Sequence, residues 1–323
     1  MSSSEFSARH WYRLSWLSCL LAPLSLIFLC VVALRRAAYA TGLRRVTRLS
    51  VPVIVVGNFV AGGTGKTPLV LWLAQHLQTL GWRPAIISRG YGGSLDTPRE
   101  VMPESNPLDV GDEPLLLARR SGVPVFVGRR RAEVAQSLLA AYPDRSLILS
   151  DDGLQHHALA RDFEIAVEDS RGHGNGLLLP AGPLRELPSR PVDAIVLNGG
   201  AAREGTWEMR LDALGFYALH ALHAPVAPAA FRGKRLHAVA GIGHPQRFFD
   251  TLRSLGLEFV AHTFPDHHLY HPQDLHFEDC DAVLMTEKDA VKCSGFGRLD
   301  LYALKIEARL DEAFLQLIDT RLR

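Results

Sequence analysis

The chain is poor in cysteine and nearly balanced in charge. It has 4 cysteines in 323 residues and a formal net charge of +1. Cys19 and Cys30 lie in an apolar run, and Cys280 and Cys293 have no metal-ligand spacing, so the sequence predicts neither a disulfide framework nor a cysteine metal site. Free thiols are typical of a reducing compartment. Because 35 Lys and Arg face 34 Asp and Glu, bulk charge does not indicate a nucleic-acid-binding protein.

Charge is absent from residues 14–34, which lie between Arg13 and Arg35. A helix of this length can cross a bilayer. A signal peptide is disfavoured because the run exceeds a signal h-region and arginines separate it from the small residues at 38–40. Pro23 and several serines weaken a clean span, so a spanning helix and a helix lying in the membrane interface both remain open. The positive-inside rule places the rest of the chain in the cytoplasm, because five arginines follow without an intervening acid: Arg35, Arg36, Arg44, Arg45 and Arg48.

An apolar strand at 53–57 leads into a glycine-rich turn and then Gly65-Lys66-Thr67. Such a turn at a helix N-terminus cradles phosphates with backbone N–H groups, while the lysine reaches the β/γ-phosphate oxygens and the threonine hydroxyl ligates Mg²⁺. The strict pattern requires glycine at position 60, where this chain has Val60, so the turn is closer to the Gly-Gly-x-Gly-Lys-Thr variants. The predicted nucleotide-binding segment is Val60, Ala61, Gly62, Gly63, Thr64, Gly65, Lys66 and Thr67.

A metal partner for this cradle is predicted at the end of another apolar strand, 146–150, which is followed by Asp151 and Asp152. Two carboxylates at a strand end are typical of the Walker B arrangement. The alternative is an ordinary turn, since Asp-Asp-Gly also favours turns. His156 comes shortly after and is a candidate substrate ligand or simply a loop histidine.

Short apolar runs alternate with helical patterns over most of the chain, which predicts an α/β fold with a mostly parallel sheet and helices on both faces. We expect an N-terminal membrane helix and basic segment at 1–48, a P-loop core at 49–205, a connector at 206–229 and a smaller α/β domain at 230–323. The connector is expected to be a hairpin of two runs, 207–211 and 216–222. Expected strands are 51–57, 84–88, 123–127, 146–150, 163–168, 192–197, 236–240, 257–262, 281–286 and 300–305, and expected helices are 66–80, 113–121 and 129–142.

A series of motifs closely resembles that of the tetraacyldisaccharide 4'-kinases, the lipid A 4'-kinases of Gram-negative bacteria. These motifs occupy residues 57–68, 88–92, 110–114, 151–156, 179–186, 264–268 and 286–292. The resemblance implies transfer of the ATP γ-phosphate, with Mg²⁺, to the 4'-hydroxyl of a tetraacylated glucosamine disaccharide 1-phosphate. It also implies an enzyme at the inner membrane with its catalytic domains on the cytoplasmic face, and contacts with the lipid substrate and membrane lipid. Nothing in the sequence indicates a protein partner or a nucleic acid.

The resemblance makes Asp112 the candidate base, with His267 from the second domain as its partner and Lys66 as the phosphate-binding catalytic residue. On sequence alone Asp112-Glu113-Pro114 is also a good helix start. The spacing of His267, His268 and His271 is compatible with zinc, but the prolines at 265 and 272 interrupt any helix that would align them.

The resemblance further implies that Glu186 contributes to the Mg²⁺ site and that Arg185 contacts phosphate or substrate. Arg131 is a candidate substrate contact, although a charged run is more often a solvated helix start. Family members tend to have an acid where this chain has Arg130. The order of Thr286-Glu287-Lys288-Asp289 differs from the guanine-recognition motif, which favours ATP over GTP; the sequence gives the segment no role. The remaining alternatives are a P-loop ATPase or GTPase of the metallochaperone or partitioning type, and a non-enzymatic nucleotide sensor.

Overall fold

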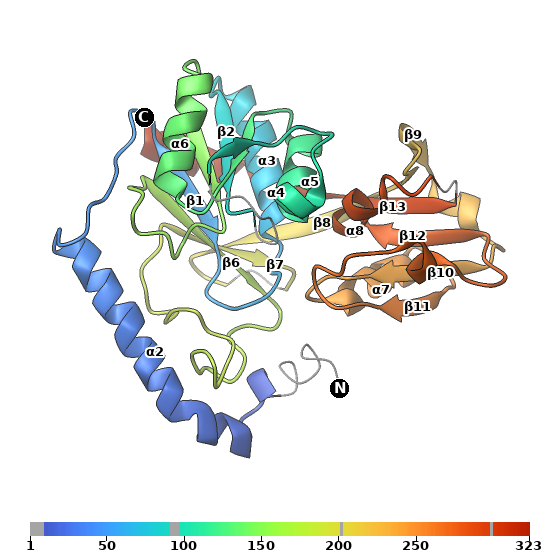
Figure 1. Ribbon diagram of the computed structural model, residues 1–323, viewed down its shortest axis with the longest axis horizontal. Coiled ribbons are helices and arrows are strands. Elements are labelled where there is room, and N and C mark those ends of the chain that lie inside the picture. The colour runs from blue at the N-terminus through green and yellow to red at the C-terminus, as the bar shows by residue number, and fades with distance from the viewer. Residues whose placement is uncertain (1–9, 91–96, 201–202, 298–299) are drawn as a thin grey trace.

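The computed structural model describes residues 10–90, 97–200, 203–297 and 300–323. Helices and strands alternate along most of the chain (Figure 1). The strands are β1 (Val53–Gly57), β2 (Pro84–Ser88), β3 (Arg99–Glu100), β4 (Val125–Val127), β5 (Leu147–Asp151), β6 (Phe163–Asp169), β7 (Ala194–Asn198), β8 (Thr206–Ala218), β9 (Ala221–Val226), β10 (Leu236–Ala240), β11 (Val260–Thr263), β12 (Ala282–Thr286) and β13 (Leu301–Arg309). The helices are α2 (Trp16–Ala40), α3 (Lys66–Thr79), α4 (Pro107–Val110), α5 (Asp112–Ser121), α6 (Arg131–Ala141), α7 (Pro245–Ser254), α8 (Glu287–Cys293) and α9 (Glu312–Leu322), with 3₁₀ turns η1 (Pro228–Phe231) and η2 (Pro272–Leu275).

The strands of the described residues join into one sheet in the order β11-β10-β12-β13-β8-β7-β6-β1-β5-β2-β4-β3, with β9 paired to β8. In the N-terminal half, β1 is central and parallel to both β5 and β6. In the C-terminal half, β10, β11, β12 and β13 are mutually parallel where they pair. Only the pairs β3–β4, β8–β9 and β8–β13 are antiparallel among the described strands. The predicted mostly parallel sheet is confirmed.

Strand β8 belongs to both halves of the sheet. Its first part runs parallel to β7, and the rest pairs antiparallel with β13. A hairpin does lie in the predicted connector, but β8 and β9 form it and its turn follows Ala218. Strand β8 covers the run 207–211 and the start of the run 216–222 without a turn between them. The sequence misled because Asp212 and Gly215 interrupt the apolar pattern at a bulge, where Gly215 has φ of +112°.

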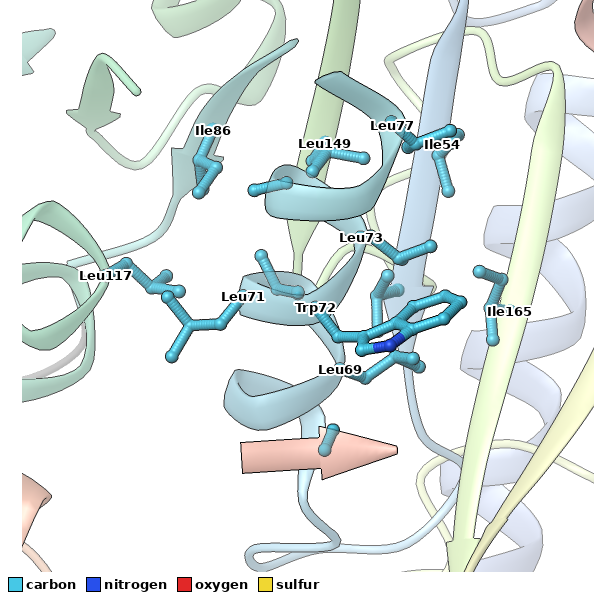
Figure 2. Packing of buried hydrophobic residues seen from close by; sticks show 14 of the residues in the cluster. Ile54, Leu69, Leu71, Trp72, Leu73, Leu77, Ile86, Leu117, Leu149 and Ile165 are labelled. Atoms are coloured by element: carbon cyan, nitrogen blue, oxygen red, sulfur yellow. The ribbon is translucent and has the colours of Figure 1, made fainter. Parts of the chain in front are cut away.

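Helix α3 is the centre of the N-terminal core (Figure 2). Its residues Leu69–Ala74 are all buried, because one side of the helix packs on the sheet and the other sides meet neighbouring helices. Ile54, Leu149 and Ile165 cover it from the strands, and Leu117 of α5 covers another side. Helix α6 packs on the opposite face of the sheet through Val134, Ala135 and Leu138. Helices thus lie on both faces, as predicted.

The last helix, α9, packs with the N-terminal half although the expected second domain extended to residue 323. Its Phe314 and Ile318 are fully buried in the same core as α3, and Phe314 stacks at 6.3 Å from Trp72. The Trp82 indole donates to Asp319 at 2.7 Å. The C-terminal half has two hydrophobic cores of its own, built from residues of the segment that runs from β8 to β13. The end of the chain packs with the first half instead.

Helix α2 is by length and composition able to cross a membrane; no other helix of the described residues meets that test. One of its sides docks on the loop after β6. The Ser25 hydroxyl donates to the Leu178 carbonyl at 2.7 Å and accepts from the Ala181 N–H at 3.1 Å. Most of its apolar side chains are nevertheless exposed, including Trp16, Leu20, Leu24, Leu26, Ile27, Val31 and Leu34. Figure 1 shows the helix at the margin of the molecule.

Candidate active site

The loop between β1 and α3 has the backbone of a phosphate cradle. Gly62 and Gly65 have φ of +98° and +96°, which glycine adopts without strain. A Cβ on Gly65 would lie 2.0 Å from Nδ2 of Asn198, so a larger residue does not fit. Helix α3 starts directly at Lys66, and residues 63–67 line a cavity. The loop and the positive end of the helix dipole therefore offer one anion site.

Two residues of the predicted nucleotide-binding segment point elsewhere. Val60 is buried and forms an isolated β-bridge with Leu184. The Ala61 N–H donates to the Pro183 carbonyl at 2.7 Å. The apolar packing of Val60 explains why this loop has no glycine there. The part of the predicted segment that lines the cavity is Gly63–Thr67, so the inclusion of Val60 and Ala61 as nucleotide contacts has no support in this geometry.

Lys66, Asp152 and Arg185 form a charged cluster at the cradle. The Lys66 ammonium lies 3.4 Å from Asp152 Oδ1, and Arg185 donates to both carboxylate oxygens at 3.1 and 3.2 Å. Burial raises the pKa of Asp152, but Lys66 and Arg185 outweigh burial and hold that pKa well below its usual value. Asp152 is thus a carboxylate at neutral pH, and both cations stand next to the phosphate loop.

Asp151 lies at the end of β5 and is buried. Its Oδ2 accepts from the Ser88 hydroxyl at 3.1 Å, while Oδ1 has no hydrogen-bond partner. Burial, then the charges of Glu113 and Asp152, raise its pKa. Arg131 is 3% exposed, and its guanidinium donates to the backbone carbonyls of Gly128 at 3.1 Å and Asp151 at 3.0 Å. The structure therefore makes Arg131 a support for the acidic strand end and gives its predicted substrate contact no exposed surface.

Glu186 and His156 lie on loops beside the cradle. Gln155 donates to Glu186 at 2.8 Å, and Arg190 approaches it at 3.6 Å, so the carboxylate is compensated by protein groups. Among the described residues no three His, Cys, Asp or Glu side chains cluster closely enough to hold a metal by themselves. Burial, followed by the charges of Arg131 and Arg89, lowers the pKa of His156 to about 3, so its imidazole is neutral at physiological pH.

Asp112 and His267 come together from the two halves. His267 Nδ1 lies 3.0 and 3.1 Å from the two carboxylate oxygens of Asp112, and Asp112 is 5% exposed. Asp112 starts α5 after Gly111, whose φ is +91°. His267 itself has φ of +60°, a costly conformation for a non-glycine residue and one that concentrates at functional sites. The pair is in contact across the two halves of the sheet.

The two partners shift each other's pKa. Burial raises the pKa of Asp112, but the hydrogen bond from His267 and the charge of Lys288 lower it below the usual value. Burial lowers the pKa of His267, and the hydrogen bond to Asp112 raises it above the usual value despite the opposing charge of Lys288. The lowered pKa keeps Asp112 an ionised carboxylate at neutral pH, which is the form that can accept a proton.

A cavity of about 430 Å³ lies between the two halves. The phosphate loop forms one wall, and Glu113 and Lys288, each next to the Asp112–His267 pair in the fold, also line it. Apolar residues from both halves also line it, beside polar ones such as Asp169, His244 and Thr251. The apolar residues are Leu71, Leu116, Leu211, Ile242, Phe248, Leu304 and Ile306. A cavity of this size, with convergent polar groups at one end, is typical of a small-molecule site.

Asn198 and Arg247 are among the polar residues of this cleft that sequence reasoning missed. Asn198 ends β7 and donates to the Thr64 carbonyl at 2.8 Å, and Arg247 of α7 donates to Asn198 Oδ1 at 2.5 Å. An asparagine at the end of a parallel strand was the available signal for the first. No sequence pattern marked Arg247, because it reaches the phosphate loop from the other half of the sheet.

A cradle of this kind opposite an aspartate–histidine pair combines a nucleotide phosphate site with a base for an acceptor hydroxyl. The chain is thus a P-loop protein of the phosphotransferase class. A family model described as Tetraacyldisaccharide-1-P 4'-kinase (LpxK) matches residues 17–323. The chain belongs to this family, and with it the kinase class predicted from the motifs is confirmed over the ATPase, GTPase and sensor alternatives.

Relatives and a solved structure agree with this placement. The chain is 50% identical over 324 residues to the tetraacyldisaccharide 4'-kinase of Methylobacillus flagellatus, covering 99% of this chain and 97% of the relative. It is 50% identical over 312 residues to that of Dechloromonas aromatica, covering 94% and 92%. The crystal structure of the "apo" form of LpxK from Aquifex aeolicus in complex with ATP matches with a TM-score of 0.81 and 28% identity, covering 95% of this chain and 100% of that chain. The predicted fold class is confirmed. Tyr91 and Gly92 of the 88–92 motif lie outside the described residues.

Proposed function

We propose that this kinase transfers the γ-phosphate of ATP to the 4'-hydroxyl of a tetraacylated glucosamine disaccharide 1-phosphate in lipid A biosynthesis, with Asp112 as the base. The observation that carries the proposal is the contact of His267 Nδ1 with Asp112 at 3.0 Å, next to Glu113 and Lys288 on the wall of the cleft. A nucleotide switch or simple ATPase has no need of an acceptor-activating pair built from two halves of the fold. The names of the relatives support the acceptor.

In the proposed step, the acceptor hydroxyl attacks the γ-phosphorus and its proton passes to a carboxylate oxygen of Asp112. The new oxygen–phosphorus bond forms as the bond from the γ-phosphorus to the β–γ bridging oxygen breaks, and ADP leaves with that electron pair. Lys66 would neutralise charge on the phosphates, and Arg185, already paired to Asp152 at 3.1 Å, would do the same from the other side. His267 would donate a hydrogen bond from Nδ1–H to Asp112, and this bond would hold the carboxylate toward the acceptor.

For the nucleotide, the ATP of the LpxK crystal structure supports the same cofactor here. The phosphates would lie on residues 63–67, and the adenine would lie among the apolar residues of the cleft. Leu211, Phe248 and Ile306 would pack against the faces of the adenine ring. The cleft volume of about 430 Å³ suits one nucleotide.

The donor set beside the cradle fits Mg²⁺, which usually takes one or two carboxylates together with phosphates and water. Thr67, Asp151 and Asp152 would hold it, and the buried Oδ1 of Asp151, which has no protein partner, is an oxygen of the type that Mg²⁺ or its water binds. When bound, the metal neutralises charge on the phosphates. Glu186, compensated by Gln155 and Arg190, stays a prediction as a metal ligand.

At the membrane, we propose that α2 lies in the cytoplasmic leaflet of the inner membrane rather than crossing it. One side of the helix is bound to the catalytic half through Ser25, and Phe28 and Leu29 pack against the core on that side. A span would separate these groups and take the Ser25 partner away from the Ala181 N–H, whereas the Leu178 carbonyl would keep the bond from the Gly182 N–H. The exposed apolar side chains, Trp16 and Ile27 among them, would enter the lipid.

The test is incubation of the full chain with γ-labelled ATP and the disaccharide lipid in mixed micelles, with the Asp112→Asn variant and a 4'-deoxy acceptor as controls. Label should appear in the lipid with the wild-type chain. The Asp112→Asn variant should not transfer label to the lipid, and the 4'-deoxy acceptor should not receive it. Label found only as free phosphate would make the protein an ATPase. Transfer to the 4'-deoxy acceptor would place the modification on another hydroxyl.

A further inference from the structure

The start of α8 brings a lysine to the Asp112–His267 pair from the side opposite Asp112. Lys288 Nζ lies 3.5 Å from His267 Nε2, while His267 Nδ1 faces Asp112 at 3.0 Å. The same ammonium is bound by Glu113 Oε1 at 2.9 Å and by Asp266 Oδ1 at 3.2 Å. Glu113 follows Asp112 in the chain and Asp266 precedes His267, so Lys288 is fixed between the neighbours of both members of the pair.

An ammonium can only donate hydrogen bonds. The imidazole nitrogen that faces Lys288 must therefore present a lone pair, and the ring proton must sit on the other nitrogen, Nδ1, where it points at Asp112. A proton on Nε2 would face the positive charge at 3.5 Å, which is unfavourable although Asp266 Oδ2 lies 3.9 Å from the same nitrogen. The tautomer of His267 thus follows from the position of Lys288.

We propose that Lys288 is the positioning residue of the phosphoryl-transfer site: it holds His267 in the Nδ1–H tautomer, so that the imidazole orients Asp112 and does not take up a second proton. The inference rests on the roles proposed above for Asp112 and His267. It gives the 286–292 segment the role that its sequence did not disclose. Lys292 completes the arrangement from the next turn of α8, 2.8 Å from Asp289 and 3.9 Å from Asp112.

The lysines and Asp266 around the pair act on its pKa values in opposite directions. Lys288 lowers the pKa of both Asp112 and His267, Lys292 also lowers that of Asp112, and Asp266 raises that of His267. Removing Lys288 should raise both pKa values, so that at neutral pH more of His267 carries two protons and less of Asp112 is free to accept one. Glu113 and Asp266 would also lose their shared cation.

The kinetic test compares Lys288→Met and Lys288→Arg with Lys234→Met, a change of an exposed lysine in the same half. For Lys288→Met we expect kcat to fall roughly tenfold or more and the acidic limb of the kcat/KM profile to move to higher pH. Lys288→Arg, which keeps a donor-only cation, should retain the wild-type position of that limb, and Lys234→Met should match wild type. An unmoved limb in Lys288→Met, or equal losses in the Met and Arg variants with unmoved limbs, would overturn the proposal.

A second measurement needs no activity. Histidine ¹⁵N spectra of the full chain, with His267 assigned by its absence in His267→Gln, report the tautomer directly. About two pH units above the ordinary imidazole pKa, His267 should show a protonated Nδ1 and an unprotonated Nε2, and Lys288→Met should shift it toward a tautomer mixture. A protonated Nε2 in the wild-type chain would refute the proposal even if lipid phosphorylation is observed. If the kinase assay fails while the tautomer is as expected, the acceptor is wrong and the positioning stands.

Discussion

The contact between Asp112 and His267 predicts how their substitutions combine. His267→Ala removes a hydrogen bond to a charged carboxylate at 3.0 Å. Such bonds contribute about 1.5–3 kcal/mol, which corresponds to a rate loss of about tenfold to 150-fold. Asp112→Ala removes the base itself and should cost about 10²–10⁴-fold in kcat. Because His267 acts through Asp112, the double variant should be little worse than Asp112→Ala alone, with a coupling energy close to the whole loss of His267→Ala.

The assay is single-turnover transfer from γ-labelled ATP to the lipid, with nucleotide affinity measured separately by equilibrium binding. Neither Asp112 nor His267 lines the cavity that holds the phosphate loop, so nucleotide affinity should change little in all three variants. His276→Ala, at an exposed histidine of the same half, controls for loss of a ring outside the pair. Thermal unfolding of each variant controls for misfolding.

Fully multiplicative rate losses would refute the reasoning, because they would mean that His267 contributes independently of Asp112. A loss confined to nucleotide affinity would remove both residues from the chemistry. A double variant that matches Asp112→Ala within about twofold would support one functional unit.

Three further predictions concern the phosphate loop, the N-terminal helix and the pH dependence of the Asp112–His267 pair. Lys66→Ala should lower transfer by orders of magnitude while the fold survives, because it removes the cation beside Asp152; wild-type-like turnover of the folded variant would end the phosphate-loop assignment. Deleting residues 1–40 should release much of the chain from membranes and leave ATP binding intact, as measured by flotation and nucleotide binding; full retention after a high-salt wash would show that other surfaces attach it. The stabilisation that Asp112 and His267 give each other should be greatest from about pH 4 to about 6.5. Because the pKa of Asp112 is lowered in the folded chain, its contribution is lost as pH falls through that pKa. Because the pKa of His267 is raised, its contribution is lost as pH rises through that pKa. The difference in unfolding temperature between wild type and His267→Ala should therefore shrink at both lower and higher pH, and a difference independent of pH would contradict the pairing.

Much of the fold could be predicted because its local signals agree. Strands β1, β2 and β5 are short, mostly apolar runs buried on both faces, and α3 begins at the expected lysine. Their patterns reflect local burial, which periodicity reports directly. The two-residue β3 and the four-residue α4 were not predicted, since elements this short carry no period.

What the sequence could not show by itself depends on contacts that form only in the folded chain. Helix α9 was not among the expected helices, and nothing local in its sequence shows that Phe314 packs on Trp72 of the first half. Arg131 resembled a substrate ligand because its sequence shows charge and not burial, and only the fold shows its guanidinium bound to two backbone carbonyls. Asp112 and His267 were paired through family resemblance; nothing in the spacing of 155 residues between them indicates contact.

The continuity of β8 has a consequence for how this protein can change in evolution. Side chains alternate along a strand, so a single-residue insertion between Met209 and Phe216 would turn every side chain beyond it to the opposite face of the sheet. Phe216, buried in the C-terminal core, would then face the other layer, and the pairing with β13 would slip relative to the pairing with β7. Two domains joined by a loop tolerate changes of linker length and can be exchanged between proteins. In this sheet β8 fixes which side chains face each layer in both halves, so a change in its length affects both halves at once. The two halves are therefore expected to evolve together, as a single structural unit.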